Sequence, residues 1–240
     1  PNLDGVKFLT HGLGCGETRG ISNELCGLLA GYACNPNVAG ITVLSLGCQH
    51  AQVSILEREI SQRSPNFKKP LLVFEQQKYA SEREMMEQAI RQTFAGLAQA
   101  NRLRRAATPL SKLSLGMECG ASDGFSGISA NPAIGRVADL TVALGGKVIL
   151  SEFPELCGVE QEIVNRCMNR ETGDRFIEIM RNYEERVKEA GSGFHMNPSP
   201  GNVKDGLVTD AIKSAGAARK GGTSPIVDAL DYPGWVTKPG

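Results

Sequence analysis

LSLGMECGASDGFSGISANPA, residues 113–133, decides how the second half of this chain folds. Residues 113–117 form an apolar run that predicts a strand, and small and polar residues follow it directly. Asn131 suits a helix N-cap and Pro132 the first helical position. Ligand sites of open α/β proteins have this order of strand, loop and helix, because loop glycines admit a ligand and a helix N-terminus attracts anions. The alternative is a solvated loop before a capped helix.

The same alternation of strand, loop and helix extends along the whole chain. Strands are expected at residues 6–10, 41–46, 71–74, 113–117 and 147–150, and helices at 21–32, 53–62, 81–105, 132–144, 160–168, 172–189 and 207–214. Alternating elements with buried strands indicate parallel sheets covered by helices. We therefore predict an α/β fold of two lobes, residues 1–108 and 109–240, each with a mainly parallel, Rossmann-like sheet.

The composition of the chain excludes several classes of protein. Its 240 residues contain 26 Lys plus Arg and 26 Asp plus Glu, so the chain lacks the excess of positive charge that is typical of nucleic-acid-binding proteins. No apolar run approaches the length of a membrane span, and no signal peptide is visible. Seven widely spaced cysteines, an odd number, favour reduced thiols. We expect a cytoplasmic protein with neither nucleic-acid nor membrane partners.

Metal-ligating residue types gather where the predicted strands end. They are His11, Cys15, Cys48, His50, Glu118, Cys119 and Glu152. The carboxyl ends of parallel strands share one edge of a sheet, so we expect Cys15, Cys48, Cys119 and His11 to lie close together. Such a set could bind iron, zinc or manganese. The alternative is that each free cysteine is a small core residue.

Five longer motifs carry a family resemblance. They are HGLGCG at 11–16, VLSLGCQ at 43–49, CGASDGFSGISANPAIGRVADL at 119–140, GGKVILSEFPEL at 145–156 and SPGNVKDGL at 199–207. In these motifs the chain resembles the galactarate and altronate dehydratase family. Gln49 and Ala121 depart from the family pattern, which usually has Glu and Gly there. The departures leave the substrate open.

The resemblance implies a metal-dependent lyase. It would remove water from an aldonate or aldarate such as altronate or galactarate, and so give a 2-keto-3-deoxy acid. Sulfolactate sulfo-lyase, which belongs to the same family, is an alternative, and so is a non-catalytic module that binds an anionic metabolite. The lobes would correspond to the family's second domain and the start of its C-terminal domain. A small N-terminal domain would then be missing, the fragment alone could be inactive, and the full enzyme would be a homo-oligomer.

The resemblance also implies which residues carry the chemistry. The divalent metal would be Fe²⁺, with Mn²⁺ as the alternative, and its candidate ligands are His11, Cys15, Cys48, Glu118 and Cys119. Candidate acids and bases are His11, Glu152 and Lys204. Candidate substrate-binding residues are Ser122, Asp123, Ser126, Ser129, Asn131 and Asn202. For Asp123 the alternative is a loop cap, and for Glu152 it is an ion pair that supports the site without contacting the substrate.

Overall fold

The computed structural model describes residues 2–118, 123–151, 153–232 and 234–240. Its internal contacts divide the chain into two units, Pro1–Ala106 and Ala107–Gly240. Each unit contains helices and one two-stranded parallel sheet, so the predicted α/β class is confirmed in this coarse form. In the described ranges, no helix has both the length and the apolar character needed to cross a bilayer.

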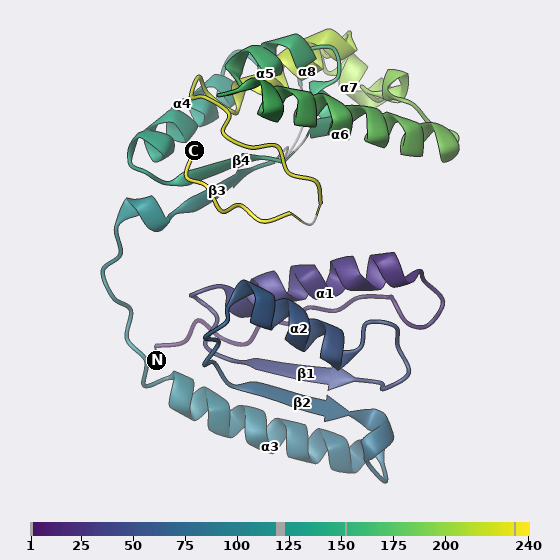
Figure 1. Ribbon diagram of the computed structural model, residues 1–240, viewed down its shortest axis with the longest axis vertical. Coiled ribbons are helices and arrows are strands. Elements are labelled where there is room, and N and C mark those ends of the chain that lie inside the picture. Colours follow the sequence, from purple (N-terminus) through teal and green to yellow (C-terminus); the bar gives the residue numbers. More distant parts are fainter. Residues whose placement is uncertain (1, 119–122, 152, 233) are drawn as a thin grey trace. The chain divides into compact units, whose positions relative to one another are not determined.

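The first unit has helices on both faces of its sheet (Figure 1). Its elements are α1 (Arg19–Cys34), β1 (Ile41–Ser45), α2 (Val53–Arg63), β2 (Leu71–Glu75), the 3-10 turn η1 (Gln76–Lys78) and α3 (Glu82–Ala100). The parallel register pairs Ile41 with Leu71 and Ser45 with Glu75. Helices α1 and α2 cover one face, and α3 covers the other.

Small side chains on α1 let α2 pack closely. Cys26 and Ala30 are almost fully buried and contact Leu56 and Ile60 of α2 in one apolar cluster. Burial also raises the pKa of the Cys26 thiol, with a smaller contribution from the carboxylate of Glu59, so this cysteine is a core residue. The strand predictions for 41–46 and 71–74 are confirmed to within one residue at the ends.

Helix α3 begins at a side-chain cap, as the sequence predicts. The Ser81 hydroxyl accepts a hydrogen bond from the backbone N–H of Glu84 at 3.2 Å. We expect Ser81→Ala to lower the free energy of unfolding by about 1 kcal/mol, because the N–H loses its partner at the helix end. Urea unfolding measures this loss. Ser61→Ala, at an exposed position inside α2, is the control and should leave stability within about 0.5 kcal/mol of wild type.

The predicted strand at residues 6–10 is wrong. The structure assigns no strand there, and Phe8 is 84% exposed. Among the described residues of this unit, β1 and β2 pair only with each other. An apolar run becomes a strand only where a neighbouring strand satisfies its backbone groups, and this segment has no such neighbour.

The second unit follows the same plan with more helices (Figure 1). Its elements are η2 (Leu110–Lys112), β3 (Ser114–Met117), α4 (Ala130–Ala143), β4 (Lys147–Leu150), η3 (Phe153–Leu156), α5 (Glu160–Arg166), α6 (Arg170–Glu189), η4 (Phe194–Met196), α7 (Pro200–Lys204) and α8 (Asp210–Arg219). Strands β3 and β4 pair in parallel, with Ser114 opposite Lys147. The backbone N–H of Val148 also donates to the carbonyl of Gly240 at 2.8 Å.

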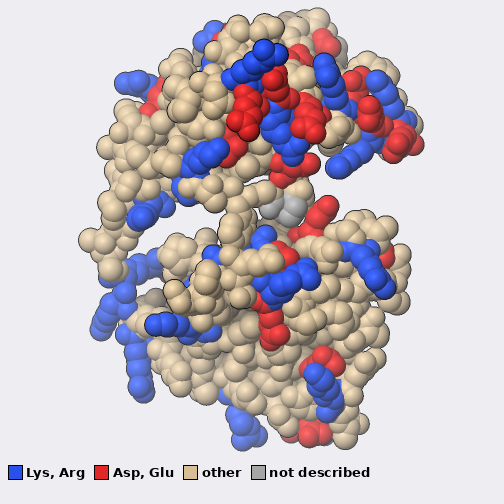
Figure 2. Space-filling view, viewed as in Figure 1, with Lys and Arg blue, Asp and Glu red and all other residues tan. Residues whose placement is uncertain are grey.

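The core of the second unit lies among α5, α6, α8 and η3. Leu156, Ile163, Phe176, Met180 and Ala217 are buried there in one cluster. The opposite side of α6 is charged and faces solvent, with the ion pairs Arg170–Asp174, Arg175–Glu178 and Lys188–Glu184 along it. Figure 2 shows basic and acidic side chains interspersed over this part of the surface. The core, rather than these exposed pairs, therefore holds α6 in place.

Several helix starts differ from the predictions by one to three residues, and for two of them hydrogen bonds show the cause. The helix expected at 207–214 begins instead at Asp210, because the Thr209 hydroxyl accepts from the N–H of Ile212 at 3.2 Å. Helix α4 begins at Ala130, so Asn131 lies inside the helix rather than at its N-cap. The buried amide of Asn131 donates to the carbonyl of Gly216 at 3.0 Å, a tertiary contact that outweighs its local capping preference.

Candidate active site

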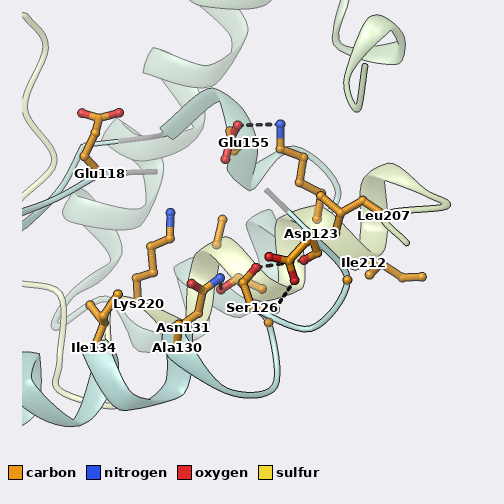
Figure 3. A pocket seen from close by; sticks show the side chains of 15 residues that line it. Glu118, Asp123, Ser126, Ala130, Asn131, Ile134, Glu155, Leu207, Ile212 and Lys220 are labelled. Carbon is orange, nitrogen blue, oxygen red and sulfur yellow. Dashed lines mark hydrogen bonds and ion pairs between the residues drawn. The ribbon is translucent and has the colours of Figure 1, made fainter. Parts of the chain in front are cut away.

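A cavity of about 240 Å³ lies in the second unit, beside the loop that connects β3 to α4. We call residues 118–129 the Gly/Ser loop. The polar side chains of the cavity lining are those of Glu118, Asp123, Ser126, Asn131, Glu155, Lys213 and Lys220 (Figure 3). Apolar side chains, among them Ile134, Leu207 and Ile212, complete the described lining. Ligand cavities have this mixture of an apolar wall and a few placed polar groups.

The described part of the Gly/Ser loop is held by its own hydrogen bonds. The Asp123 carboxylate accepts from the backbone N–H groups of Phe125 at 2.7 Å and Ser126 at 2.9 Å. The Ser126 hydroxyl donates back to the Asp123 carbonyl at 2.9 Å. Asp123 is therefore a loop cap, the alternative weighed for it, although it also lines the cavity. The exposed Ser129 donates to the carbonyl of Phe125 at 2.8 Å and is outside the lining.

The motif at residues 199–207 meets the Gly/Ser loop directly. The backbone N–H of Gly124 donates to the carbonyl of Asp205 at 2.9 Å. A Cβ at Gly124 would lie 2.8 Å from the carbonyl oxygen of Gly206, whose φ of +98° itself favours glycine. Asn202 and Lys204 lie on this motif but outside the cavity lining, and Lys204 is exposed. Their predicted roles stay predictions.

Three residues that were not predicted from the sequence, two lysines and a glutamate, also line the cavity. Lys213 pairs with the Glu155 carboxylate at 2.7 Å, and its ammonium also donates to Oδ1 of Asn197 at 2.6 Å. Lys220 is only 4% exposed and points into the space between Glu155 and Asn131 (Figure 3). Lys213 and Lys220 are about two helical turns apart in sequence and so share a helix face. That spacing, together with Glu155 inside the 145–156 motif, is the signal that could have found them.

In the first unit, the loops that follow residue 10 and β1 adjoin each other. The backbone N–H of His50 donates to the carbonyl of Gly14 at 2.9 Å. Glu17 accepts from the N–H of Gly14 at 2.8 Å and from the Ser22 hydroxyl at 3.0 Å. Burial opposes ionisation of Glu17, but its backbone and hydroxyl hydrogen bonds outweigh burial and lower its pKa. These contacts fix the loop that carries His11 and Cys15.

Gln49, one of the departures from the family pattern, organises the second of these loops. Its side-chain oxygen accepts from the N–H of Gly47 at 2.7 Å, and its amide donates to the Ser45 hydroxyl at 2.7 Å and the Ala51 carbonyl at 3.2 Å. The loop thereby leaves Cys48 exposed. Cys48 and His50 also line a hollow of about 400 Å³ on this unit.

The predicted metal ligands are only partly within the described residues. Within ranges 2–118, 123–151, 153–232 and 234–240, no three His, Cys, Asp or Glu side chains are grouped so that they could hold a metal ion. His11, Cys15 and Cys48 are exposed on the two adjoining loops of the first unit, and Glu118 lines the cavity of the second. The remaining predicted residues, Cys119, Ser122 and Glu152, lie outside the described residues.

Family models match both units. Residues 110–240 match the model described as D-galactarate/Altronate dehydratase, C-terminal, and residues 1–101 match D-galactarate dehydratase/Altronate hydrolase, second domain. The chain belongs to the galactarate and altronate dehydratase family. The resemblance that the five sequence motifs carry is thereby confirmed, and the Gly/Ser loop lies inside the C-terminal family domain.

The relatives that this chain resembles are named for different activities. An altronate dehydratase of Bacillus subtilis is 32% identical over 96% of this chain and 45% of its own length. A galactarate dehydratase (L-threo-forming) of Escherichia coli is 34% identical over 82% of this chain and 38% of its own. The beta subunit of a (2R)-sulfolactate sulfo-lyase of Chromohalobacter salexigens is 29% identical over 88% of this chain and 54% of its own. The chain thus spans about half the length of these relatives or less.

Proposed function

We propose that the protein carrying this chain is a hydro-lyase that removes water from a sugar acid and gives a 2-keto-3-deoxy acid. The reaction needs a base for the proton next to the carboxylate and an acid for the departing hydroxyl. It also needs fixed charges that stabilise the enediolate formed between these steps. His11, Glu152 and Lys204 remain the candidate acids and bases.

The observation that carries this proposal is the cavity of the second unit. Two separate family motifs, the Gly/Ser loop and residues 199–207, are hydrogen-bonded to each other beside it. Lysine, carboxylate and amide groups line it, and these groups suit the carboxylate and hydroxyls of a sugar acid. A fold alone would not indicate chemistry, but a polar cavity built from the family's own motifs supports it.

The test is a keto-acid assay of the full-length protein. Altronate, galactarate and sulfolactate are supplied separately, with and without Fe²⁺. Product from altronate or galactarate supports the proposal. The sulfolactate relative, which matches 88% of this chain, makes desulfonation the second candidate, and product from sulfolactate alone would replace dehydration by it. A protein that binds these acids without turnover would be the non-catalytic module instead.

We further propose that the enzyme uses a divalent metal, Fe²⁺ with Mn²⁺ as the alternative. The exposed thiols of Cys15 and Cys48 and the imidazole of His11 suit a borderline-soft ion rather than Mg²⁺. Glu118 and Cys119 remain the other candidate ligands. When bound, the metal would polarise the substrate carboxylate and stabilise the enediolate.

Cys48→Ser should lower the metal content and the activity of the full-length enzyme together. Loss of a residue that only hydrogen-bonds to a metal ligand weakens metal binding by about 10–100-fold. Loss of a thiolate ligand itself should therefore weaken it by about 100-fold or more. Thiolates must be deprotonated to bind, so affinity should also fall as the pH falls. Elemental analysis and activity after dialysis against a chelator measure both effects.

The matched control is Cys167→Ser. The Cys167 thiol donates to the carbonyl of Ile163 at 3.4 Å, a contact that a serine hydroxyl can keep. Burial raises its pKa, which disfavours the thiolate form that a metal needs. This variant should keep its metal and its activity. If Cys48→Ser keeps full metal and full rate as well, Cys48 is not a ligand.

A further inference from the structure

The carboxylate of Glu155 lies at the cavity of the second unit and has no role in the assignments above. Glu155 lies in η3, its side chain is 20% exposed, and it borders the cavity (Figure 3). Its oxygen Oε1 pairs with the Lys213 ammonium at 2.7 Å. In the part of the chain that the structure describes, no side chain pairs with the second oxygen, Oε2. The protein thus holds one oxygen of this carboxylate, and the other is available to a bound molecule.

We propose that Glu155 is the base that takes the proton next to the substrate carboxylate, and that Lys213 is the residue that positions it. This inference rests on the proposed function for its reaction. It names a base in the second unit in addition to the candidates His11, Glu152 and Lys204.

The proposed step moves one proton and one electron pair. Oε2 of Glu155 takes the proton from the carbon next to the carboxylate, and the electron pair of that C–H bond enters the enediolate. The pair then forms a C=C bond while the C–O bond of the neighbouring hydroxyl breaks. The acid of the reaction protonates the leaving oxygen, which departs as water. The enol that remains tautomerises to the 2-keto-3-deoxy acid, and Glu155 returns its proton to the solvent.

A chain of contacts orients the Glu155 carboxylate. The Lys213 ammonium that holds Oε1 also donates to Oδ1 of Asn197 at 2.6 Å, and the Lys213 side chain is only 9% exposed. Lys213 is therefore fixed between a carboxylate and an amide rather than free to move in solvent. Catalytic bases are often oriented in this way, by a neighbouring group that has a partner of its own.

The backbone on both sides of this ion pair is also fixed. Leu156, the residue after Glu155, is 2% exposed in the core of the unit. On α8, the Ser214 hydroxyl next to Lys213 donates to the carbonyl of Cys157 at 2.7 Å, so α8 is held against the segment that carries Glu155. A base needs such support, because a displacement of about 1 Å can lower a rate by about 100-fold.

The other carboxylates of the described cavity lining are less suited to this role. Asp123 accepts from the backbone N–H groups of Phe125 and Ser126 and so holds the Gly/Ser loop in shape. Glu118 is exposed and is a candidate metal ligand. Glu155 is partly buried, oriented by a cation and not used by its own loop, which are the properties of a positioned base.

The test compares Glu155→Gln with wild type in the full-length protein. Altronate, galactarate and sulfolactate are supplied separately in D₂O; keto-acid formation measures kcat and KM, and NMR follows exchange of the hydrogen next to the carboxylate for deuterium. We expect Glu155→Gln to lower kcat by about 100- to 10,000-fold with little change in KM. Glutamine keeps the volume and an oxygen for the Lys213 ammonium, but it cannot take up the proton.

The role of Lys213 has its own test. Lys213→Met should lower kcat by about 10–100-fold with less effect on KM, because the Glu155 carboxylate loses its orientation. Lys213→Arg should restore part of the rate, since a guanidinium can donate to both partners of Lys213. A folded Lys213→Met protein with the wild-type kcat overturns the positioning role.

The matched controls are Glu184→Gln and Lys188→Met. These two residues form an ion pair of the same 2.7 Å length on the exposed side of α6 in the same unit, and both variants should keep the wild-type kcat. Thermal unfolding shows whether each variant folds. If Glu155→Gln does not fold, Glu155→Asp replaces it, and withdrawal of the carboxylate by one methylene should lower kcat by about 100-fold.

A wild-type kcat in the folded Glu155 variant overturns the inference. A raised KM with the wild-type kcat also overturns it, because that is the result for a residue that only binds the substrate.

The two proposals fail in different ways. If wild type forms keto acid and the folded Glu155→Gln protein has the same kcat, the inference fails and the proposed function stands. If wild type forms no keto acid but exchanges the hydrogen next to the carboxylate, and Glu155→Gln does not, the proposed function fails and the inference stands. If wild type does neither, both fail.

Discussion

Gly135→Ala should destabilise the second unit by about 3 kcal/mol or more, because the new methyl group has no space. Gly135 lies on α4, where the helix passes the end of α8. A Cβ there would lie 2.2 Å from the carbonyl oxygen of Arg219 and 3.1 Å from the backbone nitrogen of Gly222. Both obstacles are backbone, so no side-chain rotation relieves the clash, and the two helices must move apart.

Urea unfolding followed by circular dichroism measures this effect. Gly116→Ala in β3 of the same unit is the control, because a Cβ there would meet nothing within 4 Å. The control should change stability by less than about 1 kcal/mol. A Gly135→Ala protein as stable as the control would show that α4 and α8 do not approach as the structure has them.

Asp139→Asn should cost the second unit about 2–3 kcal/mol of stability. The Asp139 carboxylate accepts hydrogen bonds from the backbone N–H and the hydroxyl of both Thr223 and Ser224, at 2.7 to 3.0 Å. An amide replaces one accepting oxygen by a donor, so at least one of these donors loses its partner. The exposed Asp174→Asn on α6 is the control and should have little effect.

The effect of Asp139→Asn should depend on pH. Burial opposes ionisation of Asp139, but the hydrogen bonds from Ser224 and Thr223 outweigh it and lower its pKa in the folded chain. A depressed folded-state pKa stabilises the protein above the unfolded value of about 4, and this stabilisation is lost as the pH falls through the folded-state pKa. The stability difference between wild type and variant should therefore shrink as the pH falls below the unfolded value of about 4 and through the lower folded-state pKa of Asp139. A difference that stays constant over this range would contradict the role of the ionised carboxylate.

Local features of the fold could be predicted from the sequence. The apolar run at residues 147–150 is the strand β4 without any shift, and Ser81 caps α3 as its hydroxyl and position indicate. Such features depend on side chains and backbone within a few residues, which the sequence contains. Residues 6–10 have the same apolar character but form no strand, because a strand also needs a partner from elsewhere in the chain.

The residues of the candidate site could likewise be predicted only in part. Asp123, Ser126 and Asn131 were identified from the sequence, and all three line the cavity. Lys220 was not identified, because it lies in the run AGAARKGG at 215–222, outside the five motifs. Its position at the cavity depends on the crossing of α4 and α8 at Gly135, a contact between residues far apart in the chain.

The sequence by itself determined the family, the alternation of strands and helices, and the loop beside which the cavity lies. The tertiary structure decided what the polar side chains do there. Asp123 turned to its own loop, Asn131 turned to Gly216, and Lys220 was placed at the cavity wall. The physical reason is that side-chain type and spacing set local preferences, whereas burial and hydrogen-bond partners depend on backbone segments that meet only after folding.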